Sequence, residues 1–201
     1  MIARMGATRI ARSLRLLAKR LAYGGGVSQQ QRERVVSWLA LEPGMKVADI
    51  GSGFGAYAFA FARVVGHAGV VYAVDTDADL RWQVAQDASG HDLHQVHPIE
   101  GQPDDPSIPE PVDLVFLSAS FHHLSDRSRY FRQLRDCLRP GARVVIIESR
   151  PGSCLRVPGH ATPPAEVRAT LEAAGYLPAG HADIVAGASL QAFRTADQEA
   201  G

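Results

Sequence analysis

The pattern of apolar and polar residues along the chain predicts helices and strands that follow one another in turn. Apolar residues at helical spacing predict helices over residues 9–23, 29–41, 56–65, 77–88, 127–138 and 163–175. Short apolar runs predict buried strands over residues 46–50, 70–75, 94–99, 112–119 and 142–149. Two further strands, joined around Gly187, are expected within residues 182–195, with no helix between them.

This order of elements indicates the fold class. Strands that alternate with helices are typical of a parallel, doubly wound α/β sheet that carries helices on both faces. The last two expected strands lack a connecting helix, so they must pair antiparallel, as a hairpin at the edge of the sheet.

The first predicted helix has two unlike faces. One face carries four apolar residues, Ile10, Leu14, Leu17 and Leu21, and the opposite face carries Arg12, Arg15 and Lys19. Glycines at residues 24–26 supply a joint, so we divide the chain into an arm at residues 1–26 and a domain at 27–201. Four roles stay open for the arm. It packs its apolar face on the domain, closes over a site as a lid, lies on an anionic membrane through residues 1–23, or is an organelle-targeting segment.

Composition narrows the class of protein. The chain has 201 residues, of which 46% are hydrophobic and 21% charged, as in an ordinary globular domain. Basic and acidic residues number 21 each, and no basic face persists beyond the arm, so we expect no nucleic-acid partner. Cys137 and Cys154 are the only cysteines, too few for a disulfide scaffold, so we expect a cytoplasmic protein. Neither has metal or redox spacing, and we expect no metal site. No apolar run approaches the roughly 20 residues that span a bilayer.

A glycine-rich loop at residues 51–55 separates the first strand from the helix that follows. Its three glycines let the backbone turn sharply and approach a ligand closely, and the helix directs its positive N-terminus to the same place. Asp75 ends the second strand, where a carboxylate can accept hydrogen bonds from both hydroxyls of a ribose. Loop and acid together predict a nucleoside ligand. Ala56 also fits the last position of the dinucleotide fingerprint, so the loop alone leaves NAD open.

Other residues weigh against the remaining nucleotide chemistries. Lys19 and Lys46 are the only lysines, and neither follows a tyrosine by four positions, as short-chain dehydrogenases require. The G-K-[ST] of a P-loop is absent. A nicotinamide-dependent oxidoreductase and a cofactor-binding protein without catalysis stay as alternatives.

Four stretches resemble successive motifs of class I S-adenosylmethionine-dependent methyltransferases. They are VADIGSGFG, VVYAVDTD, VDLVFLSASFHHL and LRPGARVVIIES. The resemblance extends from about residue 42 to the C-terminus and is closest to small bacterial enzymes similar to quinone and arsenite methyltransferases. It implies a Rossmann-like, doubly wound, seven-stranded, mostly parallel sheet whose last strand is antiparallel between its neighbours. It also implies S-adenosylmethionine as cofactor and a small-molecule or lipid-like methyl acceptor.

The same resemblance, carried over position by position, implies which residues bind the cofactor. Its methionine part would be held or bordered by Asp49, Gly51, Ser52, Gly53, Gly55, Ser118 and Ser120. Asp75 would bind the ribose, and Thr76 would lie beside the adenine. Where the family often has an acid near the adenine amine, this chain has Gln102, with Asp104 as the fallback.

The catalytic candidates follow the fourth strand. A base is needed only if the acceptor must lose a proton, and an imidazole, with its ordinary pKa of about 6.5, suits that role. His122 and His123 would therefore either contact the substrate as catalytic residues or orient their loop. Tyr57 faces either the methyl group or the core. His160, in the loop after the fifth strand, is a second candidate substrate contact.

Overall fold

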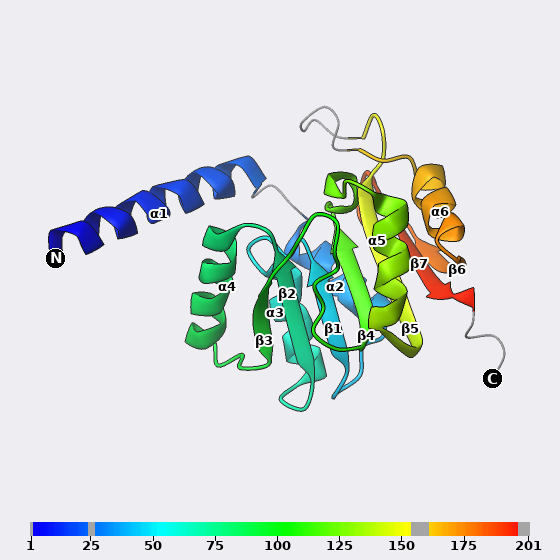
Figure 1. The fold of residues 1–201 in the computed structure, drawn as a ribbon, viewed down its shortest axis with the longest axis horizontal. Helices are drawn as coiled ribbons and strands as arrows, with labels where there is room; N and C mark the ends of the chain where they lie inside the picture. Colours follow the sequence, from blue (N-terminus) through cyan, green and yellow to red (C-terminus); the bar gives the residue numbers. More distant parts are fainter. Residues whose placement is uncertain (1, 24–26, 154–160, 197–201) are drawn as a thin grey trace.

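The computed structural model describes residues 2–23, 27–153 and 161–196 (Figure 1). Its described residues form one seven-stranded sheet in the order β3-β2-β1-β4-β5-β7-β6. The strands are β1 (Lys46–Ile50), β2 (Val70–Asp75), β3 (Val96–Glu100), β4 (Val112–Ser118), β5 (Leu138–Ser149), β6 (Tyr176–Ala182) and β7 (Ala188–Thr195). Neighbours among β1 to β5 pair parallel, whereas β7 pairs antiparallel with both β5 and β6. The expected fold class is confirmed.

Helices cover both faces of the sheet. The core on one face includes residues of α2 (Gln29–Leu39), α3 (Ala56–Val65) and α4 (Ala78–Gly90). The core on the other face includes residues of α5 (Arg127–Leu134) and α6 (Pro164–Ala173). Because both faces are buried, the parallel strands consist of nearly continuous apolar runs rather than alternating patterns.

Two helix starts follow from capping residues. Ser28 and Gln31 form a capping box at α2, in which each side chain accepts the other's backbone N–H at 3.2 Å. Asp77 caps α4 by accepting from the amides of Asp79 at 2.9 Å and Leu80 at 3.2 Å. The predicted starts of both helices are confirmed.

The predicted boundary between the fifth helix and the fifth strand is wrong. Instead of a helix over 127–138, α5 ends at Leu134 and a 3-10 turn, η2 (Arg135–Cys137), follows. Strand β5 begins at Leu138, which pairs with Val112 of β4. The register between the two strands shifts between Val112 and Leu114. The chain therefore joins the sheet before the Pro140–Gly141 turn, which the strand accommodates as an irregularity.

The sixth strand also differs from the prediction. It is Tyr176–Ala182 rather than the first part of residues 182–195, because the chain enters the sheet directly after Gly175. Tyr176 anchors the strand, with a buried ring whose hydroxyl donates to the Phe131 carbonyl at 2.9 Å. Ile184 and Val185 suggested a strand, but they are apolar because they pack on the core from a connecting segment.

The N-terminal helix α1 (Ile2–Tyr23) is longer than predicted and extends past α4, away from the sheet (Figure 1). Its side chains are described for residues 11–21. Leu14, Leu17 and Leu21, expected to pack on the domain if the helix docked on it, are 62%, 55% and 80% exposed. That packing expectation is wrong.

Basic residues of α1 face the domain instead. Arg12 Nε and Arg15 Nε lie 3.1 and 2.7 Å from the two carboxylate oxygens of Asp79, and Lys19 pairs with Asp77. The hydrogen bond from Arg15 is the main reason that the pKa of Asp79 falls to about 2. We call these three ion pairs the latch. The predicted glycine joint at residues 24–26 lies outside the described residues.

Within the described residues, no helix is both long enough and apolar enough to cross a membrane.

Candidate active site

The glycine loop lies at the carboxyl end of β1, tied to the neighbouring strand β2. The amides of Gly51 and Ser52 both donate to the Val74 carbonyl, at 2.8 and 3.0 Å. Gly51, Gly53 and Gly55 have φ of +71°, +56° and +74°, a conformation that L side chains rarely adopt. The loop that the sequence predicts as a ligand cradle therefore has the backbone geometry of one.

Ser120 closes this loop from the side of β4. Its hydroxyl donates to the Ile50 carbonyl at 2.7 Å, and its own Cβ would lie 2.5 Å from a Cβ built on Gly51. Only glycine leaves room for this contact. Ser120 also directly precedes the 3-10 turn η1 (Phe121–His123), so it joins the glycine loop to the histidine turn.

Asp49 is the penultimate residue of β1, just before the loop, and is 2% exposed. Within the described part of the chain, its Oδ2 atom is buried without a hydrogen-bond partner. The pKa of Asp49 is raised to about 7, mainly by burial and also by the Asp75 carboxylate, with the Ala58 amide opposing the shift. A buried, partnerless carboxylate oxygen is costly, and it is the group that a ligand ammonium would satisfy.

Asp75 ends β2 on the other side of the loop. Its Oδ2 accepts from the Gly53 amide at 2.8 Å, and its Oδ1 accepts from the Asp77 amide at 2.9 Å. Burial raises the pKa of Asp75, and these two amides counteract the shift. Each oxygen has a second lone pair, so the carboxylate can still accept from a ribose.

The candidate adenine contacts flank Asp75 and are exposed. Thr76 follows it directly, and its carbonyl accepts from Arg81 at 2.9 Å. Gln102 follows Gly101, whose amide donates to the Asp75 carbonyl at 3.0 Å. The structure thus brings Gln102 close to Asp75, the candidate ribose contact, whereas Asp104 lies further along an exposed loop.

Tyr57 lies in the core, one of the two positions that the sequence left open. It is 8% exposed, and its ring centroid lies 4.6 Å from that of Phe116. Burial, followed by the Asp49 carboxylate, raises its pKa above the usual range, and a contact with Ser118 opposes the shift. The Tyr57 hydroxyl therefore stays protonated, close to Ser118 at the end of β4.

His122 forms a buried pair with Glu148, a residue that the sequence reasoning missed. His122 Nδ1 lies 3.0 Å from Glu148 Oε2, and the two side chains are 6% and 0% exposed. Glu148 Oε1 accepts the Phe121 amide at 2.8 Å, so one carboxylate holds both the ring and its turn. His123 is exposed, with its ring centroid 4.1 Å from that of His122.

The signal for Glu148 was present in the sequence. Asp49, Asp75 and Glu148 each interrupt a buried apolar strand near its carboxyl end. An acid at such a position is expensive to bury unless it serves a specific partner. The sequence predicts Asp75 from its place at the end of the second strand, and the family resemblance implies Asp49, but neither indicates Glu148, whose partner lies in a different loop.

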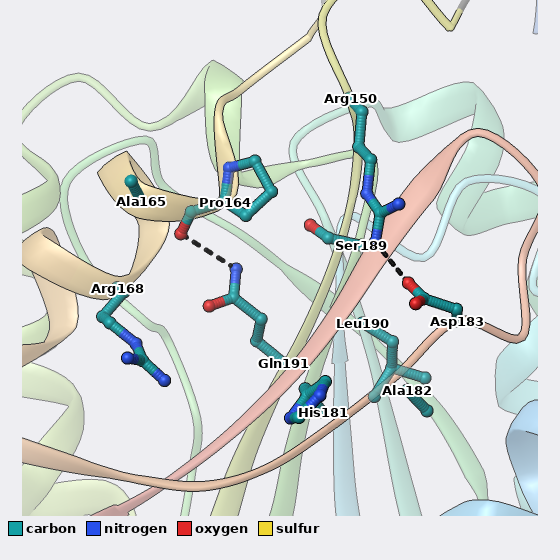
Figure 2. A pocket seen from close by; sticks show the side chains of 10 residues that line it. All are labelled: Arg150, Pro164, Ala165, Arg168, His181, Ala182, Asp183, Ser189, Leu190 and Gln191. Atoms are coloured by element: carbon teal, nitrogen blue, oxygen red, sulfur yellow. Dashed lines mark hydrogen bonds and ion pairs between the residues drawn. The ribbon is translucent and has the colours of Figure 1, made fainter.

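A separate cavity of about 350 Å³ lies between α6 and the β6–β7 edge (Figure 2). Arg150 there pairs with Asp183, and Arg168 lies 4.0 Å from Glu172, so both arginines already face an acid. None of the described residues that line it comes from the glycine loop or the histidine turn. The cavity therefore does not mark the cofactor site. His160 lies outside the described residues.

Comparisons with known proteins agree with this geometry. Residues 48–144 match the family described as methyltransferase domain. The chain is 33% identical over 127 residues to the 2-phytyl-1,4-naphtoquinone methyltransferase of Synechococcus elongatus, which covers 61% of this chain and 54% of that protein. It is 25% identical over 127 residues to the ubiquinone/menaquinone biosynthesis C-methyltransferase UbiE of Vibrio campbellii, over 62% of this chain and 49% of that protein. The chain thus spans about half the length of the curated relatives it matches.

A solved structure shows the same similarity at the level of the fold. The S-adenosylmethionine-dependent methyltransferase from Aquifex aeolicus has a TM-score of 0.72 at 26% identity, over 81% of this chain and 87% of that one. The fold is that of class I methyltransferases. The chain carries an S-adenosylmethionine-dependent methyltransferase domain.

The residues present fit this cofactor. The unpartnered Asp49 oxygen suits its ammonium group, the positive-φ glycine backbone leaves room for its methionine part, and Asp75 suits its ribose.

Proposed function

We propose that the chain transfers a methyl group from S-adenosylmethionine to a small, lipid-like acceptor with an acidic hydroxyl, such as a quinol ring. The names of the two curated relatives support a quinone-type acceptor. The bound cofactor supplies an electrophilic methyl group. The chain's own residues bind and orient it, and they manage the acceptor's proton.

The observation that carries this proposal is the buried pair of His122 and Glu148. A carboxylate can only accept, so the hydrogen bond of 3.0 Å assigns the proton to Nδ1. The Nε2 atom is then the ring nitrogen that can take up a proton. Because Ser120 joins the histidine turn to the glycine loop, this nitrogen lies at the same end of the sheet as the cofactor cradle.

In the proposed reaction, His122 would accept the proton of the acceptor hydroxyl as the acceptor's nucleophilic atom forms its bond to the methyl group. The bond between that methyl group and the cofactor sulfur would break, with S-adenosylhomocysteine as the leaving group. Glu148 keeps the ring in one tautomer and stabilises the imidazolium that results. We assign the proton to His122 rather than to its neighbour His123 because Glu148 orients the His122 ring. Tyr57 keeps its own proton, since it is a buried tyrosine with a raised pKa.

The test uses the full chain with S-adenosylmethionine and chemically reduced 1,4-naphthoquinone, either with or without an isoprenoid tail. Formation of S-adenosylhomocysteine and of methylated quinol is expected, fastest with the tailed acceptor. A chain that binds the cofactor yet yields no product with either quinol or with catechol would support the alternative, a cofactor-binding protein without catalysis.

A further inference from the structure

The exposed large hydrophobic side chains of the described residues gather at one place, on α1 and on the α4 surface beside it. They are Leu14, Leu17, Leu21 and Trp82. We call the three leucines the leucine row. They recur at i, i+3 and i+7, so they share one face of the helix.

The leucine row faces solvent because the latch occupies the opposite face. Arg12, Arg15 and Lys19 pair with carboxylates of α4, and Leu16, on the same side as these three, is buried. Arg12 also lies over the Trp82 ring, 4.7 Å from its centroid. Polar contacts thus hold the helix in place while its apolar face stays uncovered, and an uncovered apolar face on a basic helix is typical of a membrane-surface segment.

Charge identifies the kind of surface. The α1 sequence contains six basic residues and no acidic one, and its latch meets only two carboxylates, those of Asp77 and Asp79. The helix therefore keeps an excess of positive charge after docking. Such an excess complements an anionic lipid surface and not a neutral one.

We propose that α1 binds the surface of an anionic lipid bilayer, with the leucine row inserted among the lipid headgroups and acyl chains. The helix lies in the plane of the interface and does not cross it. Its 22 residues provide about six turns for this contact.

This arrangement also places the cofactor loop near the membrane. Arg20 lies over the ring of Phe54, 5.1 Å from its centroid, and Phe54 stands between two glycines of the loop. Lys19 pairs with Asp77, two residues after the ribose-binding acid. A lipid-like acceptor would then reach the site directly from the bilayer; this last step rests on the proposed function, whereas vesicle binding does not.

The experiment compares three forms of the full chain. One is unaltered, one carries Leu14→Gln, Leu17→Gln and Leu21→Gln, and one carries methionine at the same three positions. Glutamine and methionine are both good helix formers, so the two variants differ in apolarity and not in helix propensity. Each form is sedimented with phosphatidylglycerol vesicles and with phosphatidylcholine vesicles, and its binding of S-adenosylmethionine is measured as a check of folding.

We expect the unaltered chain and the methionine variant to sediment with phosphatidylglycerol vesicles, and the glutamine variant to bind about tenfold more weakly or worse. All three should bind the cofactor equally and should leave phosphatidylcholine vesicles largely unbound. Equal sedimentation of all three forms, or none by the unaltered chain, overturns the proposal. So does a vesicle-free dimer that the glutamine variant abolishes, because a second copy would then cover the leucine row.

The outcome is separable from that of the proposed function. Vesicle binding with no methylation of a quinol rejects the proposed acceptor and leaves the membrane contact intact. Methylation without vesicle binding does the reverse.

Discussion

The imidazole of His122 and the carboxylate of Glu148 lie 3.0 Å apart, although 26 residues separate them in the chain. The contact exists because β4 and β5 are parallel neighbours, with Ser118 in register with Ile147. Residues at or just after the carboxyl ends of the two strands, such as Glu148 and His122, therefore meet at one edge of the sheet.

The His122→Gln variant should lose activity and keep its cofactor. Removing a general base typically lowers kcat by about 10²- to 10⁴-fold, whereas no described contact links His122 to the glycine loop directly. The measurement is kcat together with the dissociation constant of S-adenosylmethionine. His123→Gln is the matched control, since the exposed neighbour should tolerate the same change. Near-normal kcat in the first variant would remove the base from the mechanism.

The raised pKa of Asp49 makes stability depend on pH. The folded chain keeps a proton on this carboxyl up to about pH 7, whereas the unfolded chain releases it near pH 4. The stability from this group is therefore present at low pH and is lost as pH rises through 7, by about 1.4 kcal/mol between pH 6 and 8. Urea unfolding of Asp49→Asn against the unaltered chain measures this difference, and a variant with the same pH slope as the parent would contradict it.

The same carboxyl should couple cofactor binding to pH. A ligand ammonium favours the ionised form, so binding to the cofactor-free protein below pH 7 requires that Asp49 release its proton. Affinity for S-adenosylmethionine should fall as pH drops from 8 to 6, with proton release detectable by calorimetry in buffers of different ionisation enthalpy. Asp49→Asn should bind weakly at both pH values.

The contact between Gly51 and Ser120 predicts a steric cost that can be isolated. An alanine at Gly51 brings its Cβ to 2.5 Å from that of Ser120, but an alanine at Gly53 meets nothing within 4 Å. Both substitutions strain a positive φ, at about 1–2 kcal/mol each, and Gly51→Ala should cost about 1–3 kcal/mol more. Adding Ser120→Gly should recover this excess. Equal unfolding free energies for the two alanine variants would contradict the collision.

The latch predicts that Asp79 controls how often α1 separates from the domain. Asp79→Asn removes the charge that Arg12 and Arg15 share, and the loss of about 1 kcal/mol corresponds to roughly fivefold more separation. A detached helix of this length is marginally stable in water, so trypsin should cut α1 about five times faster. Asp92→Asn, which carries the same change at a residue outside the latch, serves as the control. Added salt should narrow the difference; a difference that does not respond to salt would count against an electrostatic latch.

Local sequence signals predicted most of the fold. Ser28 and Asp77 start helices because their side chains satisfy the first free amides, which involves only a few neighbouring residues. The absence of a helix before the last strand determined the antiparallel pairing in the same way. The errors fell where distant packing decides: Leu138 joins the sheet early because Val112 is there to pair with it.

The candidate cofactor residues were predictable because a glycine loop after one strand and an acid at the end of the next form a known nucleoside-binding pattern, although Gly53 and Asp75 are 22 residues apart. Glu148 was not, because its partner His122 becomes its neighbour only through the parallel pairing of β4 and β5. The core position of Tyr57 likewise depended on Phe116 from another strand.

The amino-acid sequence by itself determined the order of strands and helices, the glycine cradle and the amphipathic character of α1, because each depends on residues a few positions apart. Only the tertiary structure decided which face of α1 meets the domain. Helical periodicity puts the leucine row and the arginines on different faces of α1, but it does not indicate which face contacts the domain. Two carboxylates at the start of α4 attract the basic face, and the leucines are thereby left facing outward.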